Sequence, residues 1–343
     1  QTGSLPLAFD VIRGVIEAEL HAPLEQLFDS IDPAPVAAAS IGQVHRAVLD
    51  GQPVAVKVRY PGVQDTVEGD FRQLARIGRL ASLGTSVDGP ALVQELRERM
   101  VEECDYGREA AWQQAFAQRW ADEPEIDVPP LLPHRSSDGV LTTGWREGDA
   151  FELLCAAPQA RRDAVAQTLV RFTFGSFFGG GVLHADPHPG NFLFPGNGRV
   201  VALDFGCVRR FPPDLLASAR RLSRLVVDDE RAGFPEAVLA SGQVGRPDRF
   251  DYDDFWAFQR WLHAPWWQPG FHFEAGWLRE GMTWTGPRAR NARHMAFPPP
   301  WLWLMRIQAG LHAVLVKLGA QGDLRAAFRE ALDTPCDPLG GPA

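Results

Sequence analysis

The chain has 343 residues, of which 45% are hydrophobic, and its formal net charge is −9. This size and composition allow two globular domains or one large two-lobed domain. The acidic balance makes nucleic acid a poor partner. The four cysteines are scattered and form no CxxC pair, so we expect neither a disulfide framework nor a zinc cluster.

We expect no signal peptide and no membrane-spanning segment in this sequence. The chain begins at Gln1 without methionine, so we expect it to be a fragment of a longer protein. The most apolar long segment, 301–318, contains Arg306, Gln308 and Lys317, so we expect no transmembrane helix. We therefore expect a cytoplasmic protein whose contact with a membrane, if it has one, is peripheral.

Helices and then a β-hairpin are predicted at the start of the chain. Residues 7–28 carry apolar side chains at helical spacing, with a break at Pro23. Segments 44–49 and 54–59 have strand character and flank Asp50-Gly51, a strong hairpin signal. Alternation along the second strand puts Ala55 and Lys57 on one face and the valines on the other.

Lys57 is a candidate phosphate ligand. Lysine occurs only at positions 57 and 317, and the valine-rich VAVK setting of Lys57 is typical of a kinase strand. A small Ala55 would leave room for a flat base, and Lys57 would supply a point charge to phosphate. The alternative is an exposed lysine on an amphipathic strand. The turn before the hairpin, 37–43, is rich in alanine and should be stiffer than a glycine-rich loop; taken alone, it has the character of a helix start or a linker.

Helices and a short strand are predicted in the middle of the chain. Residues 65–83 and 88–120 have helical character, and the second helix carries an acidic run at 102–109. A kinase needs one helix glutamate to pair with the strand lysine, and periodicity alone does not choose among the candidates. We predict a short strand at 139–145, a hinge between lobes at 143–149, and a helix at 158–178 that ends at three glycines.

The stretch from His184 to Gly206 carries the clearest chemical signal. Two apolar runs joined by a turn ending in Asn-Gly predict a hairpin, with Asn191 just before its first strand and Asp204 just after its second. Antiparallel pairing would bring these two oxygen donors together, which suits Mg²⁺. With Asp186 one loop earlier as the base, the order is that of the catalytic and metal loops of kinases. The alternative is a plain loop of turn-forming residues.

A helical region follows, and it is rich in tryptophan. Helices are predicted at 213–228, 230–242, 252–263, 300–318 and 323–332. Most of the 11 tryptophans lie between 256 and 303. We favour a dense aromatic core over a lipid-facing groove as their role.

Together these motifs resemble the UbiB/AarF/ADCK family of atypical kinases. The resemblance runs from about residue 10 to 210 and is weaker beyond. It rests on five segments: AAASIGQVHRA (37–47), VAVKVRYPGV (54–63), EECDYGREA (102–110), HADPHPGN (184–191) and LDFG (203–206). It implies an α+β, two-lobed protein-kinase-like fold, with a small β-sheet N-lobe at 1–145 and a mainly helical C-lobe at 146–343.

The resemblance also implies roles for individual residues. Lys57 corresponds to the phosphate-binding lysine, Glu109 to its helix partner, and Asp186 to the catalytic-loop aspartate. Asn191 and Asp204 correspond to the Mg²⁺ ligands. The expected nucleotide contacts are the alanine-rich loop and the ExD motif together with the strand face, namely Ala38, Ala39, Ser40, Gln43, Ala55, Lys57, Glu103 and Asp105.

The sequence departs from the family pattern in three places. No lysine precedes Lys57, so the KxGQ motif that covers the active site in relatives is absent from this sequence. Either the sequence begins after the motif or this member lacks it. The predicted hinge contains Gly144, whereas relatives typically carry a glutamate near this position. This difference puts the contacts with adenine in question. We expect no C-terminal membrane helix, and therefore no tight membrane anchoring.

We therefore expect a Mg²⁺-dependent, ATP-binding kinase or ATPase. The resemblance implies a link to ubiquinone or other isoprenoid-lipid metabolism and a lipid or isoprenoid partner. One alternative is a small-molecule phosphotransferase of the aminoglycoside or choline kinase type, which has a similar catalytic loop. Another is a non-catalytic module in which ATP switches lipid or protein binding.

Overall fold

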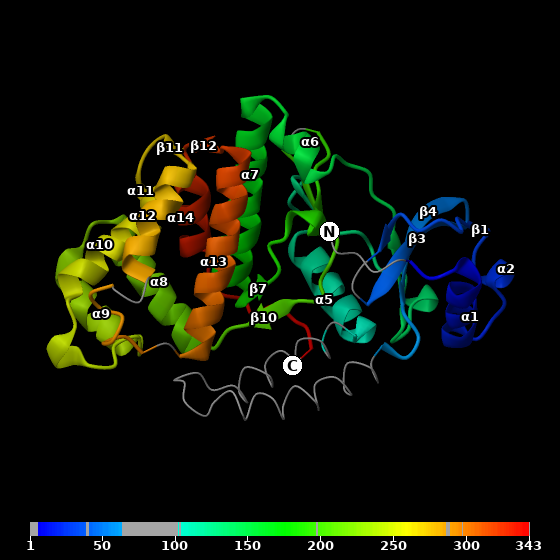
Figure 1. The fold of residues 1–343 in the computed structure, drawn as a ribbon, viewed down its shortest axis with the longest axis horizontal. Helices are drawn as coiled ribbons and strands as arrows, with labels where there is room; N and C mark the ends of the chain where they lie inside the picture. Colours follow the sequence, from blue (N-terminus) through cyan, green and yellow to red (C-terminus); the bar gives the residue numbers. More distant parts are fainter. Residues whose placement is uncertain are drawn as a thin grey trace.

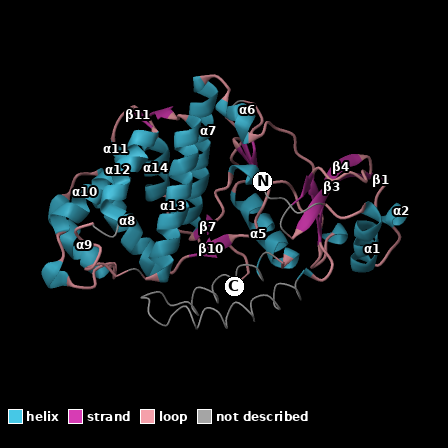
Figure 2. Ribbon diagram, in the orientation of Figure 1, coloured by secondary structure: helices cyan, strands magenta, loops and turns pink. Residues whose placement is uncertain are grey.

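The structure is a computed structural model that describes residues 6–38, 41–63, 102, 104–196, 198–285, 289–296 and 298–342. Its described part is elongated, with a small sheet and two short helices at one end and most of the helices at the other (Figures 1 and 2). The predicted helix at 65–83, and the first part of the one at 88–120, lie outside the described residues.

The main sheet is antiparallel and holds the predicted hairpin. Its strands are β1 (Ser30–Ile31), β2 (Ala37–Ala38), β3 (Gly42–Leu49), β4 (Gln52–Arg59) and β6 (Val140–Gly144). The order is β1-β3-β4-β6, and β2 also pairs with β3. Asp50 and Gly51 both have positive φ, 50° and 71°, as a two-residue hairpin turn requires. The predicted hairpin and the strand at 139–145 are confirmed.

Helices α1 (Phe9–Leu20) and α2 (Leu24–Leu27) cover one face of this sheet, and Pro23 separates them as predicted. The alternating valines of β4 are buried against Ile12 and Ile16 of α1. Lys57 belongs to the other face. The burial of alternate residues therefore decides which face of β4 remains for chemistry.

The alanine-rich segment does not begin a helix. Ala37 and Ala38 form an edge strand whose register pairs Ala37 with Val44 and Ala38 with Gln43. Alanine favours helices when it is considered alone, but here pairing with β3 satisfies the backbone and overrides that preference. Ala39 and Ser40 lie outside the described residues.

The rest of the described chain is mainly helical. Its helices are α5 (Tyr106–Arg119), α6 (Phe151–Cys155), α7 (Gln159–Phe174), α8 (Pro213–Val227), α9 (Phe234–Ala240), α10 (Tyr252–Leu262), α11 (Ala264–Trp267), α12 (Ala275–Thr285), α13 (Pro299–Leu318) and α14 (Arg325–Asp333). A π-helical turn, Gly175–Gly179, extends α7, and single 3₁₀ turns lie at Pro133–Arg135, Pro189–Asn191, Arg231–Gly233 and Pro247–Arg249.

Three small sheets complete the part of the chain that the structure describes. They pair β7 (Val182–His184) with β10 (Val208–Arg210), β8 (Phe192–Leu193) and β5 (Ile126–Asp127) with β9 (Val200–Ala202), and β11 (Phe271–His272) with β12 (Gln321–Gly322). Of the helices after 206, α8, α10, α13 and α14 lie where they were predicted, and α9 occupies the later part of the predicted 230–242 helix. Helices α6, α11 and α12 were not predicted.

The tryptophan-rich region is an aromatic core, as favoured. Trp266 is fully buried, and its ring stacks on Phe328 with centroids 5.1 Å apart. Trp256, Trp277 and Trp301 are also buried. Among the described residues, no helix has both the length and the apolar character needed to cross a bilayer.

The largest cluster of buried side chains includes residues of α5, such as Trp112 and Phe116, together with residues of α7 and α8. Helix α5 therefore joins the end that carries the sheet to the end that carries most helices. The lobe boundary at residue 145 stays a prediction.

Candidate functional site

Two strand pairs position the segment 184–206: β7 and β10 pair at its two ends, and β8 and β9 pair within it. Strand β7 pairs with β10 so that His184 lies opposite Val208, and β8 pairs with β9 so that Phe192 lies opposite Ala202. The Leu203 amide donates to the Asn191 carbonyl at 2.9 Å. The hairpin thus brings the backbone of Asn191 next to the residue that precedes Asp204, as the turn chemistry predicted.

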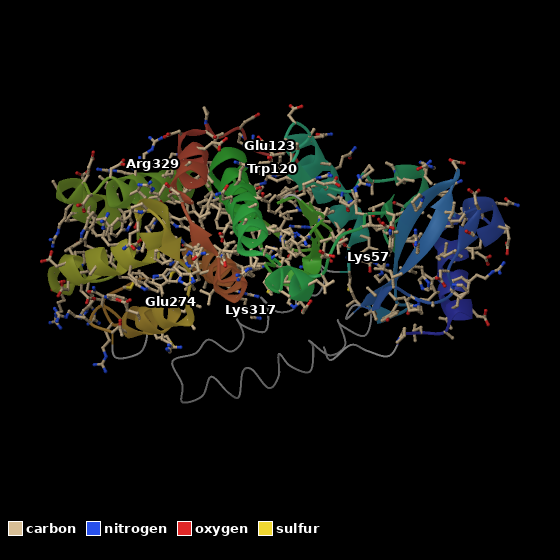
Figure 3. All side chains as sticks on the ribbon, turned by 90° about the horizontal axis from the view of Figure 1, so that it is seen from above. Lys57, Trp120, Glu123, Glu274, Lys317 and Arg329 are labelled. Atoms are coloured by element: carbon tan, nitrogen blue, oxygen red, sulfur yellow. The ribbon has the colours of Figure 1, made fainter. Side chains whose placement is uncertain are left out.

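Lys57 meets two carboxylates that are far from it in the chain. Its Nζ lies 2.7 and 2.8 Å from the two carboxylate oxygens of Glu109 on α5. The same Nζ lies 2.9 Å from Oδ2 of Asp204, which follows β9. Figure 3 shows Lys57 between the β3–β4 hairpin and the helical end, whereas the other lysine, Lys317, lies among the helices. We call Lys57, Glu109 and Asp204 the charge cluster.

The surroundings of the charge cluster shift the pKa of each member. Burial opposes the charged form of Lys57, but attraction to Asp204 and Glu109 outweighs it and holds the pKa of Lys57 well above its usual value. Burial raises the pKa of Glu109 to about 7 despite its contact with Lys57. Burial also disfavours the Asp204 carboxylate, but Lys57 and the Gly206 amide outweigh it and lower the pKa of Asp204. One ammonium therefore serves two carboxylates, and Asp204 is the one that keeps its charge most firmly.

Asp186 and Asn191 form a second group on residues 185–191, the segment that the sequence predicts to be the catalytic loop and that we call by this name. Asn191 Nδ2 donates to Oδ2 of Asp186 at 2.8 Å, and the His188 amide donates to Oδ1 of Asp186 at 3.2 Å. Asp186 is exposed, so its carboxylate is accessible from solvent. Because Asn191 donates through its nitrogen, its amide oxygen is the atom that remains for a cation.

Three buried residues that were not predicted as site residues fix this arrangement. Phe205 is fully buried, with its ring centroid 5.0 Å from Phe116 and 5.6 Å from His184. His184 Nε2 is hydrogen-bonded to the carbonyl of Asp204. The ring of Tyr106 lies 5.0 Å from Lys57 Nζ. These contacts hold the backbone at Asp204 and one side of the ammonium in place.

A sequence signal existed for two of these residues. Tyr106 precedes Glu109 by one helical turn and therefore shares its face of α5. His184 lies two residues before Asp186 and opens the stretch that carries the clearest chemical signal in the sequence. For Phe205, only its place within Asp-Phe-Gly pointed to a role.

The other residues predicted to contact the nucleotide differ in burial, and three of them lie outside the described residues. Ala55 lies half-buried on the Lys57 side of β4, and Ala38 is exposed on β2. Asp105 is exposed and caps α5, because its Oδ1 accepts from the Arg108 amide at 2.9 Å. Ala39, Ser40 and Glu103 lie outside the described residues.

Gln43 is not brought to the charge cluster. It is fully buried and pairs in register with Val58, on the face that packs against α1. Its Oε1 accepts from the Leu7 amide at 2.9 Å, and its Nε2 lies 2.8 Å from Nε2 of His45. Strand alternation puts Gln43 on the opposite face of the sheet from Lys57. This placement contradicts the predicted nucleotide contact of Gln43, whose hydrogen bonds give it a structural role instead.

The donor set fits a Mg²⁺ that is bound together with phosphates. The described residues contain no group of three or more His, Cys, Asp or Glu side chains arranged to hold a metal alone. Mg²⁺ does not need such a cage, since it is commonly held by one or two protein oxygens, water and substrate phosphates. Asp204 and Asn191 offer one carboxylate and one amide oxygen for this purpose.

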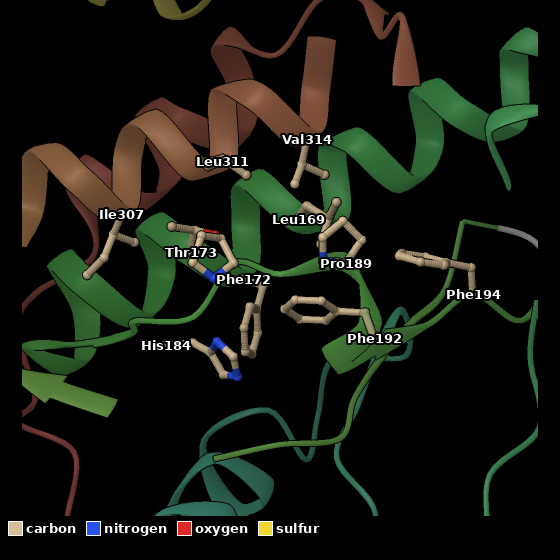
Figure 4. Close-up of a pocket in the computed structure, with 11 residues that line it drawn as sticks. Leu169, Phe172, Thr173, His184, Pro189, Phe192, Phe194, Ile307, Leu311 and Val314 are labelled. Atoms are coloured by element: carbon tan, nitrogen blue, oxygen red, sulfur yellow. The ribbon is translucent and has the colours of Figure 1, made fainter. Parts of the chain in front are cut away.

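A cavity of about 20 Å³ lies behind the catalytic loop, between α7 and α13 (Figure 4). Pro187 and Pro189 of the loop line it together with Ile307, Leu311 and Val314 of α13. It is too small for a nucleotide and has room only for a water-sized molecule. The packing behind the catalytic loop is therefore tight.

Comparison with known proteins gives the same assignment as the motifs. Residues 2–236 match the family model described as the ABC1 atypical kinase-like domain. The chain is 32% identical over 238 residues to the atypical kinase COQ8, mitochondrial, of Saccharomyces cerevisiae, which covers 68% of this chain and 47% of that protein. It is 35% identical over 206 residues to ACTIVITY OF BC1 COMPLEX KINASE 3, chloroplastic, of Arabidopsis thaliana, which covers 58% of this chain and 29% of that protein. The chain thus spans less than half the length of both relatives.

Among solved structures, the complex of Rv3197 with erythromycin from Mycobacterium tuberculosis is similar over most of the chain. The TM-score is 0.83 at 30% identity, and the match covers 97% of this chain and 85% of that one. The α+β, protein-kinase-like fold predicted from the sequence is therefore confirmed. With the family model spanning most of the chain, the protein belongs to the ABC1 atypical kinase-like family, the UbiB/AarF/ADCK group that its motifs resemble.

Proposed function

We propose that the chain binds Mg²⁺-ATP at the charge cluster and catalyses transfer of the terminal phosphoryl group to water or to a hydroxyl. The observation that carries this proposal is the contact of Lys57 with both Glu109 and Asp204, at 2.7 and 2.9 Å. A kinase needs this set of a phosphate-binding lysine, its helix glutamate and the Asp-Phe-Gly aspartate in one place.

Each residue would do one part of the work. Glu109 orients the Lys57 ammonium, which contacts phosphate oxygens. Asp204 and Asn191 hold the Mg²⁺, which neutralises phosphate charge when it is bound. Asp186 orients the attacking hydroxyl and accepts its proton. Catalysis of this kind depends on positioning and charge stabilisation more than on covalent chemistry.

The Asp-Phe-Gly aspartate gives the most direct test by mutation. Asp204→Asn keeps the shape of the side chain but removes the charge that attracts the metal. We expect ATP with Mg²⁺ to raise the melting temperature of the original chain and to leave that of the variant unchanged. Asp122→Asn, which changes an exposed turn residue, is the control and should respond as the original chain does. An undiminished thermal shift in Asp204→Asn contradicts the metal assignment.

The acceptor decides between an ATPase and a small-molecule kinase. Asp186 is exposed, so both water and a larger hydroxyl compound can approach it. Phosphate release that matches ATP consumption would favour hydrolysis, whereas transfer of labelled phosphate to an added compound would favour a kinase. The link to isoprenoid-quinone or lipid metabolism is proposed from family membership, and peripheral membrane contact and a cytoplasmic location stay predictions from the sequence.

A further inference from the structure

Helix α13 packs against the catalytic loop at a point where no side chain fits. Gly310 of α13 faces Pro187, the residue after Asp186. A Cβ added to Gly310 would collide with Cγ of Pro187 and lie 3.3 Å from its Cβ. The proline ring cannot swing aside, because it is closed onto the backbone. Either α13 or the catalytic loop would have to move to admit a methyl group.

Helix α13 is held in place on its other side. Its His312 is 1% exposed, and its ring centroid lies 4.9 Å from Trp277 and 5.8 Å from Trp266. Leu315 and Leu318 of the same helix are fully buried. The aromatic core therefore blocks α13 from moving away, and the loop is the part that would shift.

A second contact of α13 reaches the strand beside the loop. Trp303 lies under the guanidinium of Arg209, 4.9 Å from ring centroid to Cζ. Arg209 belongs to β10, which pairs with β7, and its Nη1 lies 2.6 Å from Oε2 of Glu102 next to the ExD motif. Helix α13 thus touches both the catalytic loop and the strand pair that supports it.

We propose that Gly310 is a positioning residue for Asp186: α13, supported by the aromatic core, sets the position of Pro187 and through it that of the catalytic aspartate. Residue 310 lies beyond the 2–236 segment that matches the family model. The proposal assigns the tryptophan-rich region a part in catalysis as the support of α13. It rests on the proposed function for its effect on turnover, but the effect on the loop itself can be measured separately.

Gly310→Ala is the test, since alanine is otherwise favourable inside a helix. We expect kcat for ATP to fall about tenfold to a hundredfold, as for a small misplacement of a catalytic group. KM for ATP should change less than about twofold, because Lys57 and Asp204 are untouched. Hydrogen exchange of the amides at 185–191 should become faster, with little change elsewhere. Gly14→Ala on α1, where an added methyl has nothing within 4 Å, is the matched control and should leave turnover unchanged.

A second substitution separates a local collision from general damage. In a Pro187→Ala background the colliding Cγ is gone, so adding Gly310→Ala should cost much less than it does alone. If Gly310→Ala changes neither turnover nor loop exchange, or if Pro187→Ala gives no relief, the proposal is wrong. If the original chain turns over no ATP, the proposed function is wrong. Hydrogen exchange of the amides at 185–191 then still decides whether Gly310 positions the loop.

Discussion

At the scale of single residues, the charge cluster is a shared ion pair. The side chain of Glu109 is 1% exposed and that of Lys57 18%, so water screens their interaction only weakly. A single ammonium cannot fully compensate two carboxylates. The result is an Asp204 that keeps its charge and a Glu109 whose pKa burial raises to about 7.

This arrangement predicts a pH dependence with a definite sign. Above its pKa Glu109 is ionised and holds Lys57 in place, whereas below it Glu109 is neutral and holds Lys57 less firmly. We therefore expect kcat/KM for ATP to rise with pH through about 7. Glu109→Gln should be slower and should lose this rise, because glutamine does not titrate.

The same shift affects stability in the opposite direction. A raised carboxyl pKa in the folded state stabilises the fold at low pH, and this contribution is lost as pH rises from about 4.5 to about 7. Glu109→Gln should therefore show a weaker decline of stability with pH than the original chain. If the rise of kcat/KM with pH persists unchanged in Glu109→Gln, a group other than Glu109 causes that rise.

At the scale of elements, β3 and α5 approach each other closely at Gly42. A Cβ there would lie 2.5 Å from the carbonyl oxygen of Val58 and 2.6 Å from the hydroxyl of Tyr106. Because Tyr106 lies against Lys57, the absence of a side chain at Gly42 lets the start of α5 pack beside the charge cluster.

Gly42→Ala should therefore disturb both stability and the site. We expect a loss of about 1–3 kcal/mol in the free energy of unfolding, which is typical of overpacking. Affinity for Mg²⁺-ATP should also fall, because Tyr106 must move. Urea denaturation and nucleotide titration measure the two effects. Gly14→Ala, measured in parallel, should stabilise by about 0.5–1 kcal/mol, and an equal response of the two variants would exclude the close approach as the cause.

Elements with a strong local signal could be predicted from the sequence, and elements whose own residues favour another structure could not. The Asp50-Gly51 hairpin is specified by its own turn, and the hairpin before Asp204 was predicted from its two apolar runs and the turn-forming residues between them. Strand β2 was not predicted, because its alanines favour a helix, and it exists because Ala38 pairs with Gln43. Helix α12 was not predicted, because it contains Gly276 and Gly281, which weaken a helical pattern. In both cases the residue types of the element, taken alone, favour a different structure.

The site shows the same division. Motifs predicted Lys57 and Asp204, and the family resemblance predicted Glu109, since periodicity left several acidic residues open. The structure brings these three side chains together. The predicted nucleotide contact of Gln43 depends on the strand register, which the motif does not show. That register pairs Gln43 with Val58 and turns its side chain away from Lys57. The contact of Gly310 with Pro187 joins residues too far apart for any sequence pattern to connect.

At the scale of the whole molecule, the charge cluster joins three distant parts of the chain, and the aromatic core supports the part that carries the catalytic loop. Trp266 is central to this core, with its centroid 5.1 Å from both Phe174 and Phe328. The tryptophans thus stabilise the fold from inside.

Trp266→Ala tests that role. We expect a loss of about 3–5 kcal/mol in the free energy of unfolding, since a large buried ring leaves a cavity. Met282 is 63% exposed, so Met282→Ala should change stability by less than about 0.5 kcal/mol. Urea denaturation measures both variants. A lipid-facing role for Trp266 would instead leave stability nearly unchanged and weaken binding to liposomes.

A crystal structure with Mg²⁺ and a non-hydrolysable ATP analogue tests the central claim most directly. We expect the metal about 2.1 Å from a carboxylate oxygen of Asp204 and from the amide oxygen of Asn191. We also expect Lys57 Nζ within hydrogen-bonding distance of a phosphate oxygen, with Glu109 still holding it. A nucleotide bound away from Lys57, or a metal that Asp204 does not coordinate, would contradict the account.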